Sequence, residues 1–324
     1  MPCCPQVLAG KARETRLRPF GPHWSAGGGV RLSVTLLSLC VALLAALPAA
    51  PARADAAACP ETPTIAVPTA GGPAYGTLQY ARTVNLGPKQ VALTFDDGPS
   101  PDVTPLILDI LDQHCVKATF FMVGIYAEKH PDIVRDVAAR GHTIATHTWS
   151  HPNNLRHLPL SNAQREIRRG FEAVENALAS APADARARLM PFFRFPGLND
   201  SQPLMRWLGE RNIATLSCEF GADDWRTISA SEVRRRAMRN IRSVGSGILI
   251  LHDTKPRTAS MLSSLVTSLR AEGYELVQLV GQEGARELAF NVPDPLLRPD
   301  GDKAAEEAIQ SARLRPAASP LIEP

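Results

Sequence analysis

Two adjacent carboxylates, Asp96 and Asp97, follow an apolar run and precede a Gly-Pro turn in the segment TFDDGP, residues 94–99. Neighbouring carboxylates repel each other unless a cation bound by one of them lets both stay ionised. The other carboxylate is then free to act as a base toward water. The alternative is an exposed acidic turn that caps a helix, because Asp, Gly and Pro are also common in loops.

Two histidines four residues apart, His147 and His151, form a second cluster. In one helical turn, imidazoles at this spacing point the same way and bind a single metal ion. Thr148 stands where the His-Glu-x-x-His helix of metalloproteases has its catalytic Glu, which disfavours peptide hydrolysis. Two imidazoles and one carboxylate suit hydrolytic Zn²⁺ and also non-haem iron, so the ligands predict a divalent metal without naming the reaction. Such an ion would lower the pKa of bound water and polarise an acyl oxygen.

His252 ends the apolar run of residues 248–251, which is typical of a buried strand. At the mouth of that strand it would protonate a leaving amine, the alternative being a His that caps a loop. Charged groups at a buried mouth need partners, so we expect Arg194 beside a carboxylate and Asp224 beside a His, with surface ion pairs as the alternative. Trp225 is either core or an apolar wall for a small acyl group.

Short apolar runs alternate with amphipathic stretches from residue 90 onward. This pattern predicts a parallel sheet covered by helices, either a barrel or a doubly wound sheet, in which chemistry gathers at the C-terminal ends of the strands. Strands are expected at 91–95, 119–123, 143–146, 192–195, 213–217, 248–251 and 274–279. Helices are expected at 103–114, 131–140, 162–180, 202–210, 232–241 and 260–272. The polar clusters follow the strands, as an active site at that edge requires.

The chain of 324 residues is long enough for one catalytic domain, expected at 88–285, with additional segments. Residues 1–54 resemble a signal segment, because basic residues precede the apolar run 32–47 and Ala-Arg-Ala at 52–54 suits cleavage. We therefore expect a periplasmic or secreted protein without stable membrane insertion, the alternative being an uncleaved anchor. Residues 55–87 are expected to form a linker or irregular cap, and 286–324 a disordered Pro/Ala-rich tail. A net charge of +3 and 6% aromatic residues do not indicate a nucleic-acid partner.

Three cysteines lie outside the signal segment: Cys59, Cys115 and Cys218. This odd number cannot make a full disulfide framework. Cys115 and Cys218 either pair in an oxidising compartment or are both small buried hydrophobes.

Taken in order, TFDDG at 94–98 and His-x-x-x-His at 147–151 resemble the polysaccharide deacetylases of carbohydrate esterase family four. Their domain is named for the nodulation chitooligosaccharide deacetylase, and the resemblance covers about residues 90–280. It implies a distorted (β/α) barrel of about seven parallel strands. It also implies a hydrolase that removes N-acetyl groups from an amino-sugar polymer such as a chitooligosaccharide, peptidoglycan or a related glycan. The expected cofactor is a divalent metal, Zn²⁺ first and Co²⁺ as a second option.

The resemblance also implies roles for individual residues. Asp96 matches the general base, Arg194 the residue that orients it, and His252 the general acid tuned by Asp224. The metal ligands implied are Asp97, His147 and His151.

Three further positions are implied to contact substrate: Trp225 at the border of the acetyl pocket, Ile250 beneath the acetyl methyl, and Gly197 with its backbone N–H at the oxyanion. Gly197 replaces the Tyr that family members commonly have, and Gly221 replaces an Asp three residues before Asp224. Both departures bear on the substrate and not on the reaction.

Two other functions share these motifs. An O-acetyl esterase acting on a xylan-type polysaccharide would use the same attack step, so acetate release from the two substrates must separate them. A non-catalytic carbohydrate-binding relative would be expected to lack metal ligands or the base, and this chain has all of them.

Overall fold

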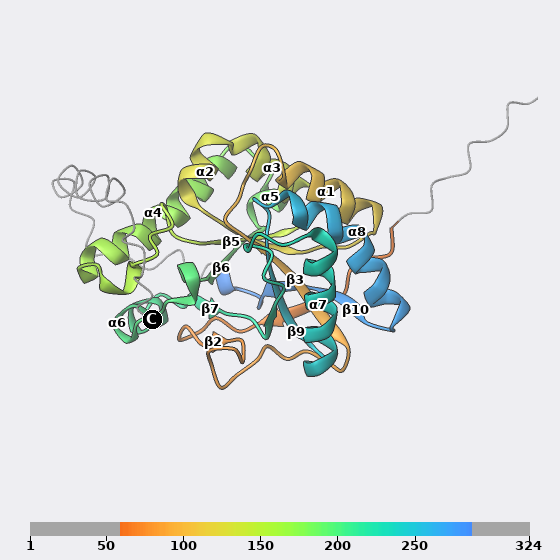
Figure 1. The fold of residues 1–324 in the computed structure, drawn as a ribbon. Helices are drawn as coiled ribbons and strands as arrows, with labels where there is room; N and C mark the ends of the chain where they lie inside the picture. The colour runs from red at the N-terminus through yellow and green to blue at the C-terminus, as the bar shows by residue number, and fades with distance from the viewer. Residues whose placement is uncertain (1–58, 287–324) are drawn as a thin grey trace, which may run out of the picture. The chain divides into compact units, whose positions relative to one another are not determined.

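A computed structural model describes residues 59–286, in which parallel strands alternate with helices along the chain (Figure 1). All pairings in its ten-stranded sheet are parallel. The strands are β1 (Thr64–Val67), β2 (Ala74–Tyr75), β3 (Gln90–Asp96), β4 (Thr119–Met122), β5 (Thr143–Thr146), β6 (Leu189–Phe193), β7 (Ala214–Leu216), β8 (Phe220–Gly221), β9 (Gly247–His252) and β10 (Glu275–Gly281). The seven strands expected from the sequence are all present, and β1, β2 and β8 are additional.

Helices connect most of the strands, as the alternating pattern predicts. They are α1 (Thr104–Gln113), α2 (Gly124–Lys129), α3 (Pro131–Ala139), α4 (Leu160–Leu178), α5 (Ala183–Arg186), α6 (Gln202–Gly209), α7 (Ala230–Val244) and α8 (Pro256–Ala271). Short 3₁₀ turns are η1 (Leu155–His157) and η2 (Pro196–Leu198). The six expected helices are confirmed with shifted ends, whereas the short helices α2 and α5 were not expected. Among residues 59–286, no helix is both long and apolar enough to cross a bilayer.

The main path of the sheet runs β1-β10-β3-β4-β5-β6-β7-β2, and off this path β9 pairs with both β3 and β8. Only residues 217–219 separate β7 from β8, a link far shorter than the crossover that parallel neighbours need. β7 and β8 are therefore two halves of one bent strand, which pairs first with β6 and then with β9. No ladder joins β7 to β8 within the described range, so only the chain itself connects the β6–β7 and β8–β9 ladders at this place.

Residues 59–87 belong to the fold, which corrects the expectation of a linker or irregular cap for 55–87. β1 pairs with β10 and β2 pairs with β7. Val67 and Tyr75, two apolar side chains of this Pro- and Gly-rich stretch, are buried in an apolar cluster of the sheet. The folded domain thus begins before residue 88. The expected signal (1–54) and most of the expected tail (286–324) lie outside the described residues.

Alternation along β3 decides which of its side chains reach the active site. Val91, Leu93 and Phe95 pack in the larger apolar cluster, together with residues of the covering helices, whereas Ala92 packs in the second cluster with apolar residues of the other strands. Because successive side chains of a strand point to opposite faces, Asp96 lies on the same face as Ala92. The last residue of β3 is therefore delivered to the inner side of the curved sheet.

The cysteines pair differently from the expectation. Cys59 and Cys115 form a disulfide with a Cα–Cα distance of 5.2 Å, and Cys218 is a free, buried thiol. A Cys115–Cys218 bond is excluded because Cys115 precedes β4, at the edge where strands begin, whereas Cys218 follows β7 at the opposite edge. The alternative of a small buried hydrophobe is correct for Cys218 alone.

Candidate active site

The ends of neighbouring strands bring the predicted acid and base together. Asp96 is the last residue of β3 and His252 the last of β9, and the two residues are register partners in that ladder. His147 directly follows β5 and Arg194 directly follows β6. Groups more than 150 positions apart in the sequence therefore meet at one edge because the strands are parallel.

Asp96 is buried, and its Oδ1 accepts a hydrogen bond from Nη1 of Arg194 at 2.6 Å. Arg194 is fully buried as well, and its remaining donors reach Thr94 Oγ1 and the carbonyl oxygens of Leu216 and Ser217. Its guanidinium lies over the Phe121 ring at 4.0 Å. Arg194 thus pairs with a carboxylate as expected and is not part of a surface ion pair. Burial raises the pKa of Asp96, and the Arg194 charge opposes that rise.

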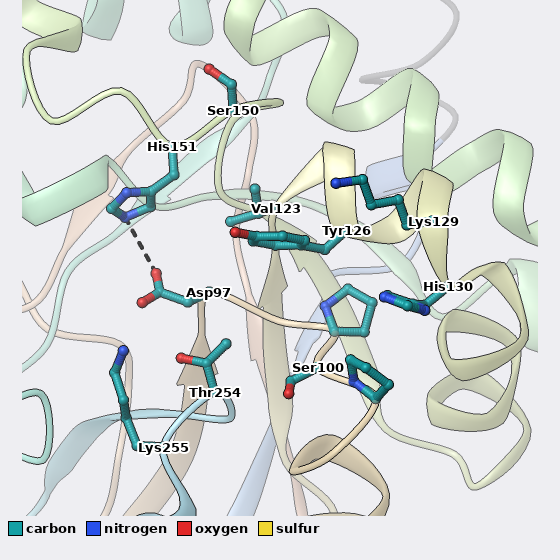
Figure 2. Close-up of a pocket in the computed structure, with 12 residues that line it drawn as sticks. Asp97, Ser100, Val123, Tyr126, Lys129, His130, Ser150, His151, Thr254 and Lys255 are labelled. Atoms are coloured by element: carbon teal, nitrogen blue, oxygen red, sulfur yellow. Dashed lines mark ion pairs between the residues drawn. The ribbon is translucent and has the colours of Figure 1, made fainter. Parts of the chain in front are cut away.

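Asp97, His147 and His151 offer three ligand atoms that all lie within 4.8 Å of one another. Nε2 of His151 is 3.3 Å from Oδ1 of Asp97, the contact drawn in Figure 2, and Nε2 of His147 is 3.7 Å from the same oxygen. Nδ1 of His147 bonds to the carbonyl oxygen of Arg194 at 2.7 Å. A carbonyl only accepts, so Nδ1 is the donor and Nε2 keeps its lone pair toward the cluster.

Two further observations show that this cluster fits a divalent cation. Within the described residues, Oδ1 of Asp97 is buried and receives no hydrogen bond, an arrangement that is costly without a partner. Burial and the neighbouring His151 lower the pKa of His147 to about 3, so its imidazole is neutral, as a ligand must be. Two nitrogens and one carboxylate are a donor set that suits Zn²⁺.

The segment 147–151 is not helical, which corrects the geometry expected from the four-residue spacing. Thr148 and His151 have φ of 66° and 56°, and Pro152 disfavours a right-handed helix at His151. Oγ1 of Thr148 instead accepts the backbone N–H of His151 at 3.0 Å. The two imidazoles still face each other, with ring centroids 4.9 Å apart.

His252 is held by Asp224 through two hydrogen bonds. Oδ1 of Asp224 is 2.7 Å from Nδ1 of His252, and Oδ2 accepts the backbone N–H of the same residue. Thr258 donates to Oδ2 as well, at 2.7 Å. Burial lowers the pKa of His252, but the hydrogen bond and charge of Asp224, with the charges of Asp96 and Asp97, outweigh it and raise the pKa to about 9. The imidazole is therefore protonated at neutral pH.

Three residues were expected to contact substrate: Ile250, Trp225 and Gly197. Ile250 pairs with Gly221 across the β8–β9 ladder, and a Cβ added to Gly221 would lie 3.3 Å from Cγ2 of Ile250. Trp225 is 59% exposed and stacks with Arg226, so it is not a core residue. Gly197 has φ of 59°, a left-handed conformation that favours glycine at this place in the turn after Arg194. Their roles toward a substrate stay predictions.

Sequence reasoning missed three buried polar residues that support the site. Glu166 on α4 accepts hydrogen bonds from the backbone N–H and hydroxyl of Ser150 at 2.8 and 2.9 Å, and its carbonyl accepts the N–H of Trp149. Asp253 accepts from Thr104, and Thr258 supports Asp224. Of these three residues, only Glu166 could have been found from the sequence. It is a carboxylate within the apolar face of an amphipathic helix, beside Ala163, Ile167 and Gly170, and a charged residue there indicates a buried partner.

Comparison with known proteins agrees with this fold. Residues 83–205 match the family model for polysaccharide deacetylase. A peptidoglycan-N-acetylglucosamine deacetylase of Bacillus cereus is 32% identical over 204 residues, which cover 62% of this chain and 70% of that protein. A chitooligosaccharide deacetylase of Sinorhizobium fredii is 30% identical over 213 residues, covering 61% and 94%. The solved structure of a peptidoglycan deacetylase from Bdellovibrio bacteriovorus gives a TM-score of 0.62 at 28% identity, covering 72% of this chain and 63% of that one.

The parallel α/β fold and its Asp-His-His cluster define a class of metal-dependent deacetylases. The chain belongs to the polysaccharide deacetylase family, carbohydrate esterase family four.

Proposed function

We propose that this protein is a metal-dependent hydrolase that removes N-acetyl groups from an amino-sugar polymer. One observation carries the proposal: a buried carboxylate and a protonated imidazole end adjacent strands, beside a three-ligand cluster. The names of the relatives support an amino-sugar substrate, since those proteins are called peptidoglycan and chitooligosaccharide deacetylases.

Asp96 is the proposed general base. Its Oδ1 is fixed by Arg194, and its Oδ2 faces the cluster at 3.8 Å from Nε2 of His147. The free oxygen is therefore placed to take a proton from a water molecule attacking an acyl carbon. A divalent ion held by Asp97, His147 and His151 would polarise the acyl oxygen and lower the pKa of that water. Zn²⁺ is the proposed ion, with Co²⁺ as a second option.

His252 is the proposed general acid. With a pKa of about 9, it carries a proton at neutral pH and gives it to the departing amine of the sugar. Asp224 fixes the ring through Nδ1, so Nε2 is the atom that donates. The backbone N–H of Gly197 is proposed to assist at the developing oxyanion.

The test compares wild-type protein with Asp96→Asn, both loaded with Zn²⁺, on N-acetylglucosamine oligomers. Acetate release should fall by at least about 100-fold in the variant, the scale expected for loss of a general base. Zinc content of both proteins, measured by atomic emission, controls for damage to the cluster. An Asp96→Asn protein that holds its zinc and releases acetate at the wild-type rate would falsify the assignment.

The same assay tests the esterase alternative. Acetylated xylan replaces the amino-sugar oligomer, because ester and amide cleavage share the attack step and differ in the leaving group. We expect acetate from the amino sugar and little from xylan. Faster release from xylan would replace the proposed substrate with an O-acetylated one.

We also propose that the protein is exported. The Cys59–Cys115 disulfide supports this, because such bonds persist in oxidising compartments. Sequencing of the mature N-terminus should find a start near Asp55 if the signal is cleaved.

A further inference from the structure

The turn that follows β2 lies at the same edge of the sheet as the candidate active site. β2 is parallel to β7, and Tyr75, its last residue, is the register partner of Leu216 (Figure 1). Residues 76–80 therefore leave β2 at the edge where β3 and β9 end with the proposed base and acid. Because active sites of parallel α/β folds are built from segments at this edge, the turn is placed to contribute to this one.

Hydrogen bonds fix the turn to the bend between β7 and β8. The N–H of Leu78 donates to the carbonyl of Cys218 at 3.0 Å. The N–H of Thr77 donates to the buried carboxylate of Glu219, also at 3.0 Å. The residue before Cys218 in the same bend accepts a hydrogen bond from Arg194 through its carbonyl. The turn is thus held next to the chain segment that contacts the side chain orienting the proposed base.

A second contact joins the turn to the segment that carries Gly197. The side-chain amide of Gln79 donates to the carbonyl of Leu198, the next residue in η2. A Cβ added to Gly197 would meet no atom within 4 Å beyond its chain neighbours, so the space beside this glycine is open. The turn after β2 therefore borders an open space next to the N–H that is proposed to assist at the oxyanion.

Leu78 exposes an apolar side chain at this edge. It is 60% exposed, although its backbone is fixed. Of the large apolar side chains that are exposed within residues 59–286, only Leu78 and Trp225 lie outside helices. Both follow strands at the edge of the active site, Leu78 after β2 and Trp225 after β8. Single exposed leucines are common, but loops at this edge are where binding residues gather.

We propose that the turn 76–80 is a wall of the substrate groove and that Leu78 contacts the apolar face of a sugar ring of the glycan chain. An amino-sugar ring with equatorial substituents exposes C–H groups on its faces, and an aliphatic side chain that covers them removes apolar surface from water. Gln79 is a positioning residue, since it holds the turn on η2.

This contact lies outside residues 83–205, the range that matches the family model. The proposal rests on the proposed function, which places the acetamido group of the glycan at the metal cluster. It adds a contact that acts on binding of the chain and leaves the reaction itself to Asp96 and His252.

The test measures KM and kcat of zinc-loaded proteins on the tetrasaccharide of N-acetylglucosamine. We expect Leu78→Ala to raise KM about fivefold, roughly the effect of uncovering one methylene group. Its kcat should stay at the wild-type value, because the contact is equally strong in the ground state and the transition state. Leu78→Met, with a side chain of similar volume, should keep the wild-type KM. Val244→Ala is the matched control, since Val244 is 52% exposed at the end of α7, at the opposite edge of the sheet.

KM does not depend on the concentration of active enzyme, so partial unfolding or loss of metal lowers the apparent kcat and leaves KM intact. A wild-type KM in Leu78→Ala overturns the proposal. A rise in Val244→Ala or Leu78→Met as large as that in Leu78→Ala also overturns it.

If wild-type protein releases no acetate from the tetrasaccharide, the proposed function fails instead. The wall is then tested by calorimetric binding of the same tetrasaccharide to zinc-loaded wild type and Leu78→Ala. Binding that the variant weakens about fivefold supports the contact, whereas equal affinities or an absence of binding overturn it.

Discussion

Asp96 and Asp97 are neighbours in sequence but face different partners. Asp96 ends β3 with its carboxylate on Arg194, and Asp97 follows with φ of 77°, a left-handed conformation that turns its side chain toward His151. This turn separates the two roles that adjacent carboxylates need if both are to stay ionised. The residue types of the site were predictable, because each polar cluster follows an apolar run. The hydrogen-bond partners of these residues were not predictable. Nothing in the sequence marks Thr258 or Thr104, which lie in helices, as a partner of Asp224 or Asp253.

The pairing of His252 with Asp224 predicts a specific change in pH dependence. His252 must be protonated to act as an acid, so activity is lost as the pH rises through its pKa of about 9. Asp224→Asn removes the charge that holds this pKa up, while burial still lowers it. The alkaline limb of kcat/KM against pH should therefore move to lower pH by roughly 1–3 units.

Lys89→Gln serves as the control for that profile, because Lys89 bonds to Glu272 outside the site. An alkaline limb at the wild-type position in Asp224→Asn would contradict the assignment of His252 as the acid that Asp224 tunes.

At the scale of elements, the strands were the most predictable part of the fold. Parallel strands buried on both faces are continuous apolar runs, which the sequence shows directly. The short elements were missed because of their length. α2 has only six residues and no room for a helical period, and β1 and β2 have only four and two residues in a Pro-rich stretch. The non-helical path of 147–151 was only partly predictable: Pro152 disfavours a helix at His151, but the contacts with Glu166 on α4 come from an element that follows the segment in the chain.

The contact between α4 and segment 147–151 predicts an effect on metal affinity at a distance. Glu166→Ala removes the two hydrogen bonds that the Glu166 carboxylate accepts from the N–H and hydroxyl of Ser150, so we expect the neighbouring His151 to be held less firmly. We expect zinc to bind about 10- to 100-fold more weakly, the usual cost of losing a group that orients a ligand. Competition with a chromophoric chelator measures this.

Glu172→Ala on the same helix is the matched control, because that carboxylate is 46% exposed and faces Arg168. Thermal unfolding of the metal-free proteins separates a local effect from loss of folding. Wild-type zinc affinity in a folded Glu166→Ala protein would show that the segment is positioned by other contacts.

At the scale of the whole domain, the first described residues are tied to the sheet twice. β1 and β2 add to the ladder, and the Cys59–Cys115 disulfide joins the segment before β1 to the turn after α1. The composition of 55–87 could not reveal this, because its many Pro, Ala and Gly residues are typical of a linker and its apolar residues form no long run. The cysteine count likewise could not predict which cysteines form the disulfide, because their distance in the folded chain decides the pairing and their spacing in the sequence does not.

The disulfide predicts a measurable loss of stability on reduction. It spans 56 positions, for which loop entropy contributes about 4 kcal/mol to the free energy of unfolding. Urea unfolding with and without dithiothreitol should show this difference in wild-type protein. Cys59→Ser should be as unstable as reduced protein and insensitive to the reductant, because residues 59–286 then hold no disulfide to reduce: Cys115 has lost its partner and Cys218 is a free, buried thiol. Equal stability of oxidised and reduced wild type would contradict the estimate.

Arg194 also stabilises the bend between β7 and β8. Where β7 ends, its guanidinium donates to the carbonyls of Leu216 and Ser217, and so it holds the chain at the bend that leads to β8. The same side chain thus holds both the proposed general base and the bent strand, and no substitution there will separate the two effects. An engineer who wants an inactive protein that still binds glycan should leave Arg194 alone and change the carboxylate it holds.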